Sequence, residues 1–67
     1  MGEFATRLAE LRSEKGLSQK ELAGMVGVSI AAIGHWENSR REPTASNLVA
    51  LAKYFGVSTD YLLGLED

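Results

Sequence analysis

Apolar side chains recur every three or four residues along most of this chain, which is the spacing of amphipathic helices. Phe4, Leu8 and Leu11 lie at i, i+4 and i+7 and predict a helix over about residues 3–15, ended by Gly16. No stretch alternates between apolar and polar residues as a half-buried strand does. The pattern therefore predicts an all-α chain.

The stretch from Gln19 to Asn38 organises the rest, and it predicts two short helices joined by a tight turn at residues 27–29. Ser18 and Glu21 have the spacing of a capping box at the start of the first helix. Gly27 stands where that helix should end, because glycine adopts the left-handed conformation without steric cost. Ser29 is the expected N-cap of the second helix.

Two positions in this stretch differ in size in a way that suits a steep crossing of the two helices. Ala23 is small enough for the backbones to approach near the turn, whereas Ile33 is large enough to fill the angle deeper inside. Trp36 lies three residues after Ile33 and is expected on the same inward side, rather than as a stacking surface for bases. This arrangement is that of a helix-turn-helix, whose second helix is free to enter a DNA major groove.

The second half of the chain predicts two more helices after a loop at residues 38–43. Thr44 is the expected N-cap of the first of them, and Gly56 its end. Ser58 is the expected cap of a last short helix over about residues 59–63. The buried stripe of the longer helix is expected to comprise Leu48, Leu51, Ala52 and Phe55.

Length and composition narrow the class of protein. Sixty-seven residues suit one small domain over 1–67, and the absence of cysteine excludes disulfides and thiolate metal sites. No secretory signal or bilayer-length apolar run is visible, so we expect a cytoplasmic protein without membrane contact. The net charge of −2 argues mildly against nucleic-acid binding, although Arg40 and Arg41 follow the second helix of the central stretch.

With these residues in view, the chain resembles the lambda-repressor and Cro family of helix-turn-helix domains. The resemblance rests on the order and spacing of RLAELRSEKGLSQKELA, GVS, IGHWENSRREP and LVALAKYFGVSTDYLLG, which span roughly residues 4–64. It implies a compact five-helix fold with the helix-turn-helix at the second and third helices. It also implies a double-stranded DNA operator as the partner.

At about 100° per residue, the side of the second central helix opposite Ile33 and Trp36 carries Ile30, Ala31, Gly34 and His35. The resemblance makes these four the candidates for base contacts. Arg, Gln and Asn, the common base readers, are absent from this side. Readout would therefore depend on thymine methyl groups, DNA shape and His35. The alternatives are that the apolar pair packs on a neighbouring helix or chain, and that His35 is only a solvent-exposed histidine.

Phosphate contacts are expected beside that helix. By resemblance, Gln19 holds a phosphate at the start of its helix, where free N–H groups favour anions. Ser29 is expected to act similarly. Asn38, through its backbone or its amide, and Arg40 with Arg41 would hold the other strand. The alternative for the two arginines is a solvated pair of loop charges.

Two further expectations come from the family pattern. Arg12 and Glu37 match positions that form an ion pair between the first and third helices. Tyr61, Leu62 and Leu65 form an apolar end that is expected to contact a partner chain, so that a homodimer reads two half-sites on DNA. The alternative is that these side chains only close the core of the monomer.

The leading hypothesis is a sequence-specific transcriptional regulator, most simply a repressor that binds a palindromic operator. The alternative is a protein-interaction module of the same fold without DNA binding, which the acidic composition favours. No nucleophile–base pair, phosphate loop or metal-ligand set indicates an enzyme or a cofactor. The chain is either a complete small regulator or the DNA-binding part of a longer one.

Overall fold

Each helix begins and ends close to the residues whose chemistry marks a helix boundary. The computed structural model describes residues 2–67, so Met1 of the expected 1–67 unit lies outside the described residues. These residues form five helices and no strand, as predicted: α1 (Gly2–Glu14), α2 (Gln19–Val26), α3 (Ile30–Glu37), α4 (Ala45–Phe55) and α5 (Thr59–Leu62). Within them, every helix is too short or too polar to cross a membrane.

The start of α2 is a complete capping box. The Ser18 hydroxyl accepts from the Glu21 backbone N–H at 3.0 Å, and the Ser18 backbone N–H donates to the Glu21 carboxylate at 2.8 Å. The bond from the backbone N–H of Ser18 lowers the pKa of the Glu21 carboxyl, with a smaller contribution from the Ser18 side chain. Gly27 ends the helix with φ +76° and donates its N–H to the Ala23 carbonyl.

The other helices that have a capping side chain begin in a similar way. Ser29, Thr44 and Ser58 each accept a hydrogen bond from the backbone N–H three residues on, as N-cap residues do. Gly56 closes α4 in the left-handed conformation. The predicted boundaries of α4 and α5 are therefore confirmed to within one residue.

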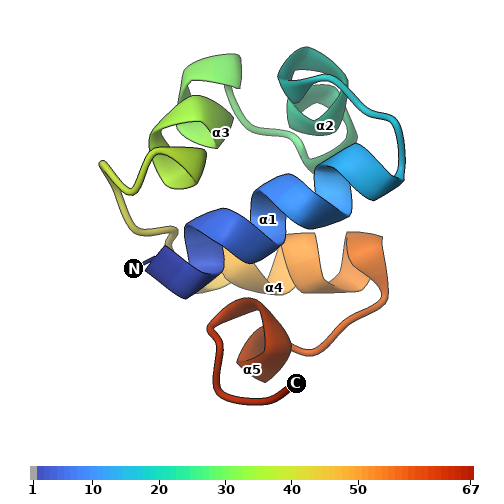
Figure 1. Ribbon diagram of the computed structural model, residues 1–67. Coiled ribbons are helices and arrows are strands. Elements are labelled where there is room, and N and C mark those ends of the chain that lie inside the picture. The colour runs from blue at the N-terminus through green and yellow to red at the C-terminus, as the bar shows by residue number, and fades with distance from the viewer. Residues whose placement is uncertain (1) are drawn as a thin grey trace.

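The helices pack around one apolar core: α1 contacts α3 and α5, and α2 contacts α3 and α4 (Figure 1). In that view α2 and α3 lie on one side of α1, and α4 and α5 lie on the other. Phe4 of α1 meets Trp36 of α3 edge to face, with ring centroids 6.3 Å apart. The fully or nearly fully buried core comprises Phe4, Leu8, Leu22, Ala23, Ile33, Trp36, Leu51, Ala52 and Leu62.

The crossing of α2 and α3 uses the small and large residues that the sequence indicates. Ala23 is 2% exposed and Ile33 is completely buried, and both belong to the core. The backbone N–H groups of Gly27 and Val28 both donate to the Ala23 carbonyl, at 2.9 and 3.0 Å. These bonds fix the turn, and the turn fixes the direction in which α3 leaves it.

The apolar C-terminal end divides between core and surface. Leu62 is completely buried, so the prediction of Leu62 as a dimer contact is wrong: its side chain closes the monomer core. Tyr61 is half-buried, and the Arg7 guanidinium lies 4.3 Å from its ring centroid. Arg7 also donates to the Tyr61 carbonyl at 2.7 Å. Only Leu65, which is 71% exposed, remains a large apolar surface residue at this end.

Two glycines differ in what an added methyl group would do. A Cβ on Gly24 in α2 would meet no atom within 4 Å, so Gly24→Ala should stabilise the fold by about 1 kcal/mol. Gly64 has φ +78°, and a Cβ there would lie 2.6 Å from the Glu3 Cβ, so Gly64→Ala should destabilise it by about 2 kcal/mol. Urea denaturation of both variants checks the opposite signs. A stabilised Gly64→Ala variant would show that the tail does not pack on α1 as described.

Candidate nucleic-acid interface

Helix α3 turns one side to the core and the other to solvent. Ile33 and Trp36, at 0% and 4% exposure, hold its inner side. On the outer side Ile30 is 48% exposed, Ala31 is exposed, and Gly34 and His35 are half-exposed. The four predicted base contacts therefore share one accessible face.

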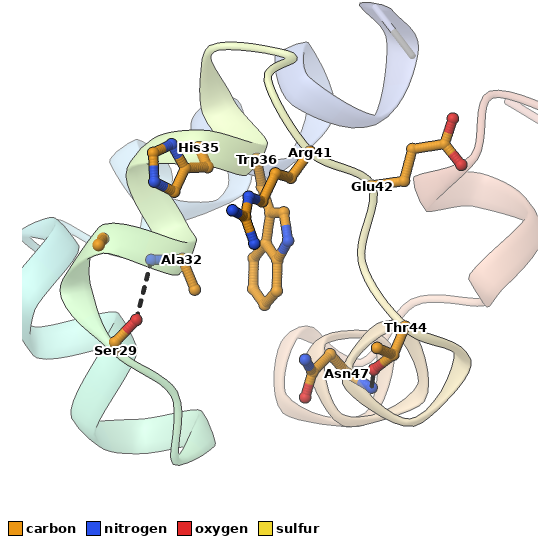
Figure 2. Close-up of a pocket in the computed structure, with 9 residues that line it drawn as sticks. Ser29, Ala32, His35, Trp36, Arg41, Glu42, Thr44 and Asn47 are labelled. Carbon is orange, nitrogen blue, oxygen red and sulfur yellow. Dashed lines mark hydrogen bonds between the residues drawn. The ribbon is translucent and has the colours of Figure 1, made fainter.

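A hollow of about 370 Å³ lies beside this face, between α3 and the start of α4 (Figure 2). His35 of α3 and Arg41 of the following loop border it on one side, and Thr44 and Asn47 border it on the other. Glu42 points away from Arg41 in this view. A guanidinium, an imidazole and the first turn of a helix around one hollow can together accommodate an anionic group such as a phosphate.

The predicted phosphate contacts surround α3 at both of its ends. Gln19 is the first residue of α2, and Ser29 is the N-cap of α3. The Ser29 hydroxyl oxygen accepts the capping hydrogen bond, so the hydroxyl hydrogen remains free to donate. Arg40 and Arg41 are exposed in the loop after α3. The structure thus places these groups beside α3 and leaves Ser29, Arg40 and Arg41 exposed.

Asn38 is the exception, because its polar groups already serve α3. Its backbone N–H donates to the Gly34 carbonyl at 3.0 Å, and its side-chain Nδ2 donates to the same oxygen at 2.9 Å. The Asn38 backbone N–H is therefore not free in this structure to bind a phosphate, since it is used in ending the helix. The second hydrogen of its side-chain amide remains for a ligand.

Arg12 and Glu37 form the ion pair that the family pattern implies. The guanidinium donates from Nε and Nη2 to the two carboxylate oxygens at 2.7 and 3.0 Å, and from Nη1 to the Leu17 carbonyl at 2.8 Å. The side chains are only 19% and 8% exposed. Hydrogen bonding to Glu37 raises the pKa of Arg12, so the guanidinium stays charged. It joins the end of α1 to the end of α3.

A third member of this network has no signal in the sequence. The Gln19 side-chain Nε2 donates to Glu37 Oε1 at 3.1 Å, which links the start of α2 to the end of α3. The two residues are 18 apart and lie on different helices, so no periodicity connects them. The sequence indicated Thr44 only as the start of a helix, and its place beside the hollow with Asn47 depends on the packing of α4.

The fold and this exposed face define a helix-turn-helix domain. Comparison with known proteins agrees: the sequence model described as Helix-turn-helix matches residues 8–62. The chain belongs to this family, and it is of the lambda-repressor and Cro type. The family and five-helix fold predicted from the sequence are thereby confirmed.

Individual relatives give the same result. Repressor protein C2 of Salmonella phage P22 is 46% identical over 94% of this chain. The crystal structure of that repressor with a synthetic operator matches at a TM-score of 0.90 and 39% identity, and covers 98% of this chain and 100% of the solved one. The restriction-modification controller C.AhdI from Aeromonas hydrophila matches at a TM-score of 0.82 and 34% identity, and covers 91% of this chain and 92% of the solved one.

Several of the matching proteins are longer than this chain. An uncharacterized HTH-type transcriptional regulator of Bacillus subtilis, YobD, is 36% identical over 96% of this chain, which spans 57% of that protein. The chain spans 28% of the phage P22 repressor.

Proposed function

We propose that this chain is the sequence-specific DNA-binding domain of a transcriptional regulator, a repressor, and that α3 enters the major groove of its operator. The observation that carries the proposal is the two-sidedness of α3: Ile33 is completely buried, whereas Ile30 is 48% exposed. The structural match to a repressor solved with its operator supports it. The proposed domain comprises residues 1–67 and acts by binding, without catalysis or cofactor.

The proposed base contacts are weak individually and mostly apolar. Ile30 and Ala31 would meet the C5-methyl groups of thymines, and His35 would donate to a guanine or to a phosphate. Gly34 carries no side chain and lets the helix approach the groove closely. Since each contact contributes less than the ~1–3 kcal/mol of a bidentate pair, DNA shape should supply part of the specificity.

The proposed phosphate contacts come from both ends of α3. The backbone N–H groups at Gln19, the Ser29 hydroxyl and the free amide hydrogen of Asn38 would donate to phosphate oxygens as uncharged donors. Arg40 and Arg41 would add positive charge. Arg41 borders the hollow beside α3, so a phosphate seated there would meet its guanidinium.

Removing either arginine should weaken binding without changing sequence preference. Arg40→Ala or Arg41→Ala loses one phosphate contact, so affinity falls by a similar factor for every sequence and the salt slope becomes shallower by about 1. Lys53→Ala, in the last turn of α4, removes the same charge from another part of the surface and is the control. Titrations at several salt concentrations measure the slope. Equal slopes in all three variants would exclude a specific role for the loop arginines.

We propose that two copies bind one palindromic operator, because one small domain holds few phosphates. Two-fold related domains read half-sites about 34–36 Å apart. Leu65 and the exposed edge of Tyr61 are the proposed contacts between copies. Sedimentation of the protein with a full operator and with a single half-site tests this. A one-to-one complex on the full operator would contradict it.

Selection of bound duplexes from a random pool tests the proposed function most broadly. The expected result is one enriched half-site, repeated as an inverted pair, whose binding weakens steeply as salt is raised. A pool without enrichment at low salt would overturn the proposal and favour the interaction-module reading.

A further inference from the structure

The side chain of Gln19 lies against the outer side of α3 beside Gly34, a position at which the helix itself carries no side chain. A Cβ built on Gly34 would lie 3.8 Å from Gln19 Oε1, so the carboxamide occupies the space beside Gly34. Gly34 is one helical turn from Ile30 on the proposed reading face. The glycine therefore leaves this position to a side chain from α2.

The orientation of the carboxamide follows from its partner. Glu37 is a carboxylate and can only accept, so the Gln19 nitrogen must face it, as the 3.1 Å bond shows. Glu37 itself is held by two bonds from Arg12, at 2.7 and 3.0 Å. Gln19 is thus held by a partner that is itself fixed in the core-facing network.

One donor and one acceptor of this carboxamide remain free. Within residues 2–67, the bond to Glu37 is the one hydrogen bond that the side chain makes, which leaves the second N–H and the Oε1 lone pairs. The side chain is half-exposed. An oriented amide with one free donor and one free acceptor matches the N7 acceptor and N6 donor of adenine in the major groove, and guanine offers acceptors only.

We propose that Gln19 is a hydrogen-bonding base reader of this domain and selects adenine at one position of each half-site. Its backbone N–H, separately, faces a phosphate at the start of α2. Glu37 and Arg12 are positioning residues that hold the carboxamide beside Gly34. The proposal rests on the proposed entry of α3 into the groove.

The test is the affinity of the protein for every single base-pair variant of the selected half-site. The wild-type protein should prefer A·T at one position by roughly tenfold. Gln19→Ala should lose that preference and keep the others. Lys20→Ala, at the neighbouring exposed position, should keep the whole preference pattern. A uniform loss in Gln19→Ala across all variants would show a phosphate contact and overturn the proposal.

A change in the DNA alone tests the same contact without altering the fold. Replacing the selected adenine by 7-deazaadenine removes the N7 acceptor, so wild-type affinity should fall roughly tenfold and Gln19→Ala affinity should not change. An equal fall in both proteins would overturn the inference. Failure of the wild-type protein to select any sequence would instead refute the proposed function, so the two failures are distinguishable.

Discussion

Ile30→Glu should abolish operator binding, with at least a ~100-fold loss of affinity, and leave the fold intact. The side chain is 48% exposed, so the change removes little from the core. In the proposed complex, however, it places a carboxylate against the major groove and its phosphates. Opposed like charges cost several kcal/mol at an interface, and each 1.4 kcal/mol is about tenfold in affinity. Fluorescence anisotropy with a labelled operator measures the loss.

Met25→Glu is the matched control for this variant. Met25 lies on α2, is 62% exposed and undergoes the same change of charge and polarity. If α3 is the helix that enters the groove, Met25→Glu should lower the affinity for the operator only a few-fold, because it makes the net charge of the domain more negative. Equal losses in both variants would mean that net charge, rather than the outer side of α3, governs binding.

Arg12→Met should destabilise the fold by about 3 kcal/mol. The change leaves the Glu37 carboxylate, whose side chain is 8% exposed, without its cationic partner. Stranding one member of a buried pair costs about 3–5 kcal/mol, and partial exposure favours the lower value. A domain of this size has a total stability of roughly 3–10 kcal/mol, so the melting temperature should fall by roughly 10–20 °C. Urea and thermal denaturation measure both quantities.

Two variants separate the cost of the stranded charge from other effects. Arg41→Met removes an exposed arginine and should change stability by less than about 0.5 kcal/mol. The double variant Arg12→Met with Glu37→Leu also removes the unpaired carboxylate, so it should recover much of the stability that Arg12→Met loses. A single Arg12→Met variant as stable as Arg41→Met would contradict the assignment of a structural ion pair.

The helix boundaries and the core were predictable because their causes are local. Ser18 and Glu21 are three residues apart, and Gly27 ends its helix through its own backbone freedom. Ile33 and Trp36 share a helix face by spacing alone. Such signals survive in the sequence because no distant contact is needed to interpret them.

The end of α3 was not predictable in the same way. Ser39 adopts φ +58°, and the N–H groups of Ser39 and Arg40 donate back to the carbonyls of Trp36 and His35. Serine rarely takes this conformation, so the sequence indicates only a loop there. The Asn38 N–H precedes these bonds and donates to the Gly34 carbonyl.

Contacts between distant residues set the other limits. Leu62 and Leu65 are equally apolar, and only the packing of α5, a helix of four residues, decides that Leu62 is buried and Leu65 exposed. The link between Gln19 and Glu37 likewise depends on the angle between α2 and α3. The candidate reading face was therefore visible in the sequence. Gln19 was visible only as a candidate phosphate contact, and its place beside that face was not.

The most direct test of groove entry by α3 is an NMR measurement of contacts between methyl groups of the protein and of the selected operator. Intermolecular NOEs should connect the methyl groups of Ile30 and Ala31 with thymine C5-methyl protons, and none should come from Met25. If a saturated complex shows intermolecular NOEs from another surface of the domain and none from Ile30, the proposed entry of α3 into the groove is contradicted.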